Sequence, residues 1–270
     1  MVEMKVKIMK NGPYIITGNI PLYKQVMISD ENGHAIKFKE KKEISQKPSY
    51  SLCRCGQSKN KPFCDGNHKT SGFNGEEVAS KNIYQEKARI FETDKLKLID
   101  AIELCDHSRF CLRRGGIRNL IEKGDPKSIS IAKKEAGLCP SGRLLLWDKE
   151  KDISTEKIFD KEIVLIYDDE KNCEGPIWLR GEIPLESVNK KLYEIRNRMT
   201  LCRCGKSKNK PFCDGNHWMD AESEKKFKKK WSLDWVNLNI IILFIIIYKE
   251  IINMPWYNII KIYNEFIIKN

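Results

Sequence analysis

Residues 53–68 read CRCGQSKNKPFCDGNH, and residues 202–217 repeat this stretch as CRCGKSKNKPFCDGNH. The two copies differ only at Gln57 and Lys206, and each contains three cysteines and one histidine. Thiolates and imidazoles together are the ligands of zinc sites and of iron–sulfur centres. The sequence therefore predicts a metalloprotein with one four-ligand site in each copy. We call residues 53–68 the first motif and residues 202–217 the second motif.

The composition narrows the class of protein that carries these motifs. The chain has 270 residues, which is room for two or three small domains, and it holds ten cysteines. Its first residues, MVEMKVKIMKNGPY, contain no apolar signal-peptide core. We therefore expect a cytoplasmic chain whose clustered cysteines bind metal or carry redox chemistry rather than form disulfides.

The net charge of +12 raises the question of a nucleic-acid partner. The lysines are scattered, and no basic stripe is interleaved with aromatic residues, so we expect no nucleic-acid binding. A solvated basic surface is the plain interpretation of this charge. The same surface also suits an acidic redox partner protein.

The internal repeat extends beyond the two motifs. Residues 12–22 read GPYIITGNIPL, and residues 175–185 read GPIWLRGEIPL. β-branched and aromatic residues around a central glycine, with a proline near the end, predict a short strand, a kink and a turn. Each unit is thus a strand-rich segment followed by a ligand loop, and residues 37–47 add a charged insertion to the first unit. We expect the two units to form a pseudo-twofold pair, because each covers apolar surface of the other.

The spacing of the candidate ligands favours a cluster over a single zinc ion. The first two cysteines of each motif are separated by one residue, whereas zinc sites usually use C-x2–4-C. Such a pair can place two thiolates on one iron, while the third cysteine and the histidine, four residues apart, can share one turn of backbone at a second iron. The candidate ligands are Cys53, Cys55, Cys64 and His68 in the first motif and Cys202, Cys204, Cys213 and His217 in the second.

Three other positions are expected to shape each ligand loop. They are an aspartate that caps the turn, a proline that stiffens the entry and a glycine that allows a close approach to the cluster. These residues are Asp65, Pro62 and Gly66 in the first motif and Asp214, Pro211 and Gly215 in the second.

With these residues in place, both motifs resemble the CDGSH-type iron–sulfur (NEET-like) domain, whose signature is C-x-C-x2-S/T-x3-P-x-C-D-G-S/A/T-H. The one departure is Asn67 and Asn216 at the S/A/T position, where asparagine is also small and polar. The resemblance implies one 2Fe–2S cluster per motif, held by three cysteines and one histidine in a β-rich fold. A neutral, protonatable imidazole ligand would make such a cluster easier to reduce and labile in acid.

A second cysteine group lies between the motifs. Cys105 and Cys111 form a C-x5-C pair, and Cys139 begins the sequence CPSG. These features resemble the divergent single-cluster ferredoxin-like module that accompanies CDGSH units in some microbial proteins. Only three cysteines align, so His107 or Cys173 would have to supply a fourth ligand. A third iron–sulfur cluster, a zinc site and unligated cysteines in a small core all remain open.

The segment between these cysteines has the pattern of a short helix. Residues 125–137 begin with Asp125 and Pro126, which suit the start of a helix, and end at Gly137, which suits a C-terminal cap. We expect the helix over this range.

The last part of the chain has a different composition. Residues 236–248 read VNLNIIILFIIIY, which is shorter than the roughly 20 apolar residues of a membrane-spanning helix. The basic run at residues 225–230 precedes it. We expect a hydrophobic helical tail, for which three interpretations compete: a peripheral or poorly spanning membrane anchor, a helix that binds a partner or covers a domain, and a non-selected extension.

The sequence thus predicts a β-rich α+β protein. We expect a first CDGSH-type unit (1–80), a ferredoxin-like segment (81–150), a second CDGSH-type unit (151–222) and a basic, then hydrophobic tail (223–270). The expected function is electron transfer, redox sensing or cluster delivery. The alternatives are a zinc-binding interaction module and an electron-feeding subunit of an oxidoreductase. No P-loop or dinucleotide-binding glycine fingerprint is present, and we expect no catalytic site of its own.

Overall fold

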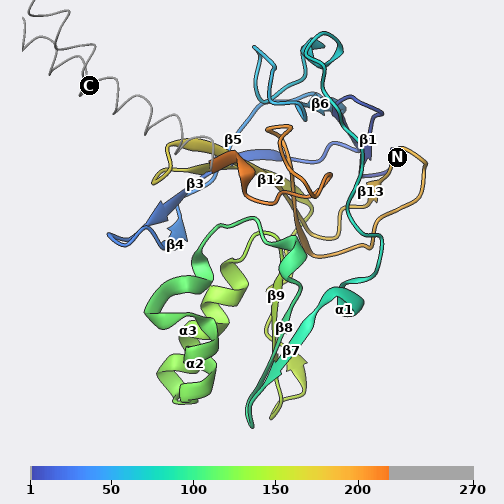
Figure 1. Cartoon of the computed structure of the whole chain (residues 1–270). Helices are drawn as coiled ribbons and strands as arrows, with labels where there is room; N and C mark the ends of the chain where they lie inside the picture. Colours follow the sequence, from blue (N-terminus) through green and yellow to red (C-terminus); the bar gives the residue numbers. More distant parts are fainter. Residues whose placement is uncertain (1, 219–270) are drawn as a thin grey trace, which may run out of the picture. The chain divides into compact units, whose positions relative to one another are not determined.

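Three β-sheets organise residues 2–218, the part of the chain that the computed structural model describes (Figure 1). Most of the helical residues in this part of the chain lie between residues 102 and 138. The expectation of a β-rich chain with few helices is therefore confirmed. The predicted tail helix lies in residues 219–270, outside the described residues.

The first sheet joins N-terminal strands to one strand of the second repeat unit. Its order is β13-β1-β2-β6. The strands are β1 (Lys5–Ile8), β2 (Tyr14–Thr17), β6 (Tyr50–Leu52) and β13 (Leu185–Glu186). β1 is antiparallel to β2 and parallel to β13, with Val6 opposite Leu185. Alternate residues of β1 are buried, as expected for a strand with one face on a core.

The second sheet has six strands and also combines strands of both repeat units. Its order is β14-β12-β11-β3-β4, and β5 also pairs with β3. The strands are β3 (Leu22–Ser29), β4 (Ala35–Phe38), β5 (Lys42–Glu43), β11 (Glu162–Asp168), β12 (Cys173–Arg180) and β14 (Arg198–Leu201). β3 lies parallel to β11, with Leu22 opposite Ile163. The second unit therefore contributes β13 to the first sheet, and the first unit contributes β3, β4 and β5 to the second sheet.

The kinks predicted within the repeated GP segments occur at glycines directly after β2 and β12. Gly18 and Gly181 have φ angles of 81° and 75°, in the left-handed region that favours glycine. A Cβ at Gly181 would lie 2.4 Å from the backbone of Asp160. The glycines thus allow the chain to turn from one sheet toward the other.

β11 separates two parts of the core. Ile163 and Leu165 belong to the main apolar cluster, which contains residues of both units. Val164 and Ile166 point to the other face and pack in a second cluster with Trp178 and Phe110. Since successive side chains of a strand alternate between faces, this run of apolar residues is buried on both sides.

The central segment, which we define as residues 81–150, forms most of a third sheet with the order β10-β9-β8-β7. Its elements are α1 (Tyr84–Lys87), β7 (Arg89–Glu92), β8 (Leu96–Asp100), η2 (Ile102–Leu104), η3 (Phe110–Gly115), α2 (Ile117–Lys123), α3 (Pro126–Leu138) and β9 (Leu144–Asp148), and β10 (Ile153–Ser154) follows. Figure 1 shows α2 and α3 side by side next to this sheet. The segment has its own apolar cluster, which includes Leu98, Leu120, Ala132 and Cys139.

The predicted helix is confirmed as α3, with one correction at its end. Asp125 caps the helix by accepting hydrogen bonds from the backbone amides of Lys127 and Ser128. Gly137 does not end the helix, which continues to Leu138. The reason is that the Arg198 side chain, rather than a left-handed glycine, binds the last carbonyl groups of α3.

Among residues 2–218, the structure contains no helix with the length and apolar character needed to cross a bilayer.

Candidate metal centres

The first motif is a loop whose two ends are joined by backbone hydrogen bonds. β6 ends at Leu52, and the Cys53 amide donates to the Pro62 carbonyl at 2.8 Å. The Cys64 amide in turn donates to the Ser51 carbonyl at 2.9 Å. This pairing brings Cys53 and Cys64, eleven positions apart in the printed sequence, to the same end of the loop.

Within the first motif the donor atoms form two pairs. The Sγ atoms of Cys53 and Cys55 lie 3.7 Å apart, and Cys64 Sγ lies 3.4 Å from His68 Nδ1. Asp65 holds the turn between Cys64 and His68, because its carboxylate accepts from the Asn67 amide at 3.1 Å and the Lys59 amide at 2.7 Å. These backbone hydrogen bonds lower the pKa of Asp65. The predicted aspartate cap is confirmed.

The second motif has the same local geometry. Cys202 and Cys204 lie 3.7 Å apart at Sγ, and Cys213 Sγ lies 3.4 Å from His217 Nδ1. Asp214 accepts from the amides of Asn216 and Lys208 at 3.1 and 2.7 Å, as Asp65 does in the first motif. The shared residues of the two motifs thus adopt the same arrangement of candidate ligands twice.

The two motifs meet at their C-x-C pairs. Cys55 and Cys204 form an isolated antiparallel β-bridge. A Cβ at Gly56 would lie 2.5 Å from the Cys204 carbonyl oxygen, and one at Gly205 would lie 2.6 Å from that of Cys55. Both glycines also have positive φ angles. Glycine is therefore required on each side of this contact.

Two buried arginines, Arg54 and Arg203, are site residues that the ligand pattern did not reveal. Each is the middle residue of a C-x-C pair, which was the only signal in the sequence. Arg54 is 1% exposed and donates to the carbonyls of Met9 and Gly75. Arg203 donates to the Gly175 and Ile166 carbonyls at 2.6 and 2.8 Å.

The Arg203 guanidinium is close to sulfur atoms of both motifs. Its burial lowers its pKa, and Glu174, Cys53 and Cys204 oppose that shift by their negative charge. A cation held between thiolates stabilises the anionic form that metal binding requires.

Burial sets the protonation of the second motif. The hydrogen bond shared with Cys202 and burial raise the pKa of Cys204, and burial raises that of Cys213. Burial, followed by the charge of Arg203, lowers the pKa of His217 to about 4. The imidazole is therefore neutral at pH 7, which is the form that binds metal. The hydrogen bond from Cys204 lowers the pKa of Cys202 to about 6, so the Cys204 and Cys213 thiols are the ones that must release protons when metal binds.

The surroundings of the two motifs differ. The first motif is open at its Cys64–His68 end, where a Cβ at Gly66 would meet no atom within 4 Å. The equivalent Cβ at Gly215 would lie 2.6 Å from the His107 ring of the central segment. Consistent with this cover, Cys213 is 2% exposed, whereas Cys64 is half-buried.

The three central cysteines lie within electrostatic reach of one another. Burial, followed by Cys139, raises the pKa of Cys111 to about 12, and Cys105 adds to the shift. Arg143 donates to Cys105 Sγ at 3.1 Å and binds Asp100 through two hydrogen bonds. Arg143 therefore places a fixed cation at Cys105, and its charge also acts on Cys111.

The two candidates for a fourth central ligand are placed elsewhere. His107 turns its ring onto Gly215 of the second motif. Cys173 opens β12, pairs with Asp168 of β11 and contributes to the charge around Arg203. The His107 ring thus faces the second motif, although its backbone hydrogen-bonds the Cys105 thiol.

The donor atoms of the motifs are not arranged around a single metal ion. In the described range, 2–218, no group of three or more His, Cys, Asp or Glu side chains is gathered in the geometry of one ion. The donors of each motif instead come as two pairs, at 3.7 and 3.4 Å. Two ligands for each of two irons fit a 2Fe–2S cluster by number and by chemistry.

Comparisons with known proteins agree with this donor set. Residues 11–69 and 174–218 match the family described as iron-binding zinc finger, CDGSH type. Residues 91–149 match the family described as divergent 4Fe-4S mono-cluster. No match was found among curated proteins or solved structures.

Proposed function

The chain is an iron–sulfur protein with two CDGSH-type regions around a divergent 4Fe-4S mono-cluster region, and we propose that each CDGSH-type motif holds one 2Fe–2S cluster. One observation carries this proposal. The same two donor pairs, a thiol pair at 3.7 Å and a thiol–imidazole pair at 3.4 Å, occur in both motifs. The two thiolates of the C-x-C pair would bind one iron, and the cysteine–histidine pair would bind the other.

The proposed activity is electron transfer. When bound, each cluster supplies reversible one-electron chemistry. The protein residues hold this chemistry in place: Arg54 and Arg203 provide buried positive charge, and the Cys55–Cys204 bridge holds the two motifs together. An imidazole ligand carries less negative charge than a thiolate, so His68 and His217 would lower the negative charge of the ligand set and make reduction easier.

The two units are proposed to form a pseudo-twofold pair. The support is reciprocal: β13 of the second unit lies parallel to β1, and β3 of the first unit lies parallel to β11. In the same reciprocal way, Gly56 of the first motif lies against Cys204, and Gly205 of the second motif lies against Cys55.

The central segment is proposed to hold a third iron–sulfur cluster at Cys105, Cys111 and Cys139. The family match covers all three cysteines, and the Arg143 guanidinium at Cys105 offers the charge that an anionic cluster needs. Three protein thiolates leave one coordination position of a four-iron cluster for another donor.

The partner is proposed to be an acidic electron-carrier protein. The chain has a net charge of +12, and Lys59 and Lys69 are exposed beside the open end of the first motif. Complementary charge accelerates the encounter of redox proteins and weakens with added salt.

Anaerobic purification tests the proposed clusters. Iron and sulfide analysis, together with visible and electron paramagnetic resonance spectra, should show about four iron atoms in 2Fe–2S form, plus those of the central site. A colourless protein with stoichiometric zinc would overturn the proposal.

A further inference from the structure

The central segment contacts the second motif directly. The His107 ring packs on Gly215, two residues from both Cys213 and His217. Asn209, also in the second motif, donates to the Glu103 carbonyl at 2.7 Å. These contacts attach the residues on both sides of Cys105 to the second motif.

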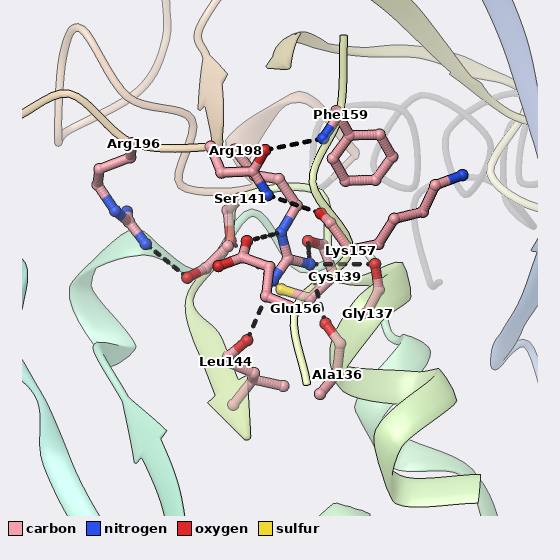
Figure 2. Close-up of polar contacts among 12 residues, drawn as sticks. Ala136, Gly137, Cys139, Ser141, Leu144, Glu156, Lys157, Phe159, Arg196 and Arg198 are labelled. Atoms are coloured by element: carbon pink, nitrogen blue, oxygen red, sulfur yellow. Dashed lines mark hydrogen bonds and ion pairs between the residues drawn. The ribbon is translucent and has the colours of Figure 1, made fainter. Parts of the chain in front are cut away.

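Arg198 makes a further connection between the two regions. It opens β14, the strand that leads to Cys202, and it is 2% exposed. Its guanidinium donates to the carbonyls of Ala136 and Cys139 at 2.9 and 2.8 Å and pairs with Glu156 at 2.6 Å. Figure 2 shows the side chain reaching the end of α3. The backbone of one central cysteine is thus fixed to the strand that carries the second motif.

Asp106 lies between the two candidate sites. It follows Cys105 in the chain and is 3% exposed, and its Oδ1 accepts from the amide and hydroxyl of Ser108. Its Oδ2 has no hydrogen-bond partner in the described part of the chain. Asp106 therefore joins Cys105 of the central site directly to His107, whose ring packs on Gly215 of the second motif.

The second motif also contacts the first motif, through the Cys55–Cys204 bridge. It therefore has a neighbouring candidate site on each side. The first motif has no such cover at Gly66, where an added Cβ would find no described atom within 4 Å. The central segment thus contacts the second motif, and the second motif contacts the first.

We propose that the second motif is the internal redox relay of the chain. It exchanges single electrons with the central site across the Asp106–His107 segment, and with the first motif across the Cys55–Cys204 bridge. The first motif is the exposed end, where a partner protein docks. His107 acts as a positioning residue, because its ring holds the central loop against Gly215.

This inference rests on the proposed clusters and adds the order in which they exchange electrons. In each exchange the reduced cluster loses one electron and its oxidised neighbour gains one, so no other reactant is consumed. Electron tunnelling weakens steeply with distance, which favours the two packed contacts over a direct step between the central site and the first motif.

Two ligand variants of the full chain test the order. The first is Cys53→Ser with Cys64→Ser, and the second is Cys202→Ser with Cys213→Ser. Each is purified anaerobically and fully reduced, and the magnetic interaction between its remaining clusters is measured by electron paramagnetic resonance relaxation. We expect a strong interaction in the first variant, where the central and second clusters remain. We expect two nearly independent spectra in the second variant.

A third variant, His107→Ala, keeps the eight candidate ligands of the two motifs and the three central cysteines, and iron analysis of this variant separates the order from simple loss of a cluster. His34→Ala is its control, since His34 lies near Asp30 in a different turn. His107→Ala should weaken the magnetic interaction between the central and second clusters several-fold at unchanged iron content. The control should match the wild type.

The outcomes are distinct. If the wild-type chain contains no iron–sulfur clusters, the proposed function fails. If all clusters are present but the central cluster interacts with the first as strongly as with the second, only the relay fails. If the magnetic interaction between the central and second clusters is unchanged in His107→Ala, the positioning role of His107 is likewise overturned.

Discussion

The first and second motifs differ at one of sixteen positions, yet they lie in different surroundings. Their donor distances are the same, 3.7 and 3.4 Å. The Cys64 end of the first motif is open, whereas Cys213 is buried beneath the central segment. Local sequence therefore determines how the ligands are arranged, and contacts from distant segments determine how each site meets solvent.

Tyr14 adds to this difference. Its hydroxyl donates to the carbonyls of Cys202 and Pro211 in the second motif, at 2.9 and 3.2 Å. The matching position in the second repeat unit is Ile177, which has no hydroxyl to offer the first motif. The second motif is thus held by a hydrogen bond that the first motif lacks.

Removal of ligand pairs should produce the largest effect. Cys53→Ser with Cys64→Ser, or Cys202→Ser with Cys213→Ser, should each remove about two iron atoms and leave the other motif's spectrum intact. Iron analysis and visible spectra measure this. Loss of both clusters from either variant would show that the motifs are not separate sites.

The next effect concerns the cover on the second motif. Cys105→Ala with Cys111→Ala and Cys139→Ala should lose the iron of the central site and keep both CDGSH-type signals. If the central site helps to hold its segment in place, a chelator should also strip the second motif faster than in the wild type. Unchanged total iron would indicate that these cysteines carry no cluster.

Acid lability gives a smaller difference between the motifs. Protons compete with iron for imidazole nitrogen, and the open first motif should lose its cluster in acid before the covered second motif. His68→Cys should therefore slow the fast phase of bleaching, and His217→Cys the slow phase, and each should lower the potential of its own cluster. Stopped-flow absorbance at about pH 5, below the ordinary pKa of histidine, measures both phases. A single phase that neither variant alters would contradict histidine ligation.

Glu135 in α3 allows a pH test of the central segment. The residue is 1% exposed, neither carboxylate oxygen has a hydrogen-bond partner in the described part of the chain, and burial raises its pKa from 4.5 to about 7. Between these two pKa values the folded state keeps a proton that the unfolded state releases. The free energy of unfolding therefore falls as pH rises through this window.

Glu135→Gln should remove this loss, because the amide stays neutral. Above about pH 7 the variant should be more stable than the wild type by up to about 3 kcal/mol, and near pH 4 the two should be equal. Denaturant unfolding at both pH values measures the change. Glu122→Gln, at an exposed position of α2, is the control and should show no such dependence. If α3 is more stable, the central segment should cover the second motif more persistently. A chelator should then remove iron from the second motif even more slowly than from the first.

Truncation after Trp218 should have the smallest effect on the motifs. Residues 219–270 contain no cysteine or histidine, so iron content and both bleaching phases should be unchanged. We also propose that the basic run at 225–230 and the apolar run at 236–248 hold the protein at an anionic membrane surface, with about 1 kcal/mol from each basic residue near the lipid. Flotation with anionic vesicles tests this, and equal behaviour of the full and truncated chains would contradict it.

Much of the candidate site was predictable because its hydrogen bonds are local. The aspartate caps, the paired loop ends and the two donor pairs involve residues within or directly beside a single motif, so a short stretch of sequence suffices to specify them. The start of α3 was predictable for the same reason, since Asp125 caps amides only two and three residues away.

Other features depend on residues far apart in the chain. The end of α3 is set by Arg198, about sixty positions away, and no helix-capping pattern reveals that partner. Arg54 and Arg203 were visible only as charged letters between cysteines, because their carbonyl acceptors lie in other parts of the chain.

By itself, the sequence determined the two candidate ligand sets, their spacing, the β-rich class and the family resemblance of each region. Only the tertiary structure decided that β13 joins the first sheet and β3, β4 and β5 join the second, and that the motifs meet at Cys55 and Cys204. It also decided that His107 covers one motif and leaves the other open. The physical reason is that local geometry follows from short-range hydrogen bonds and backbone preferences. Burial and neighbouring charge instead arise when distant segments pack together to remove apolar surface from water.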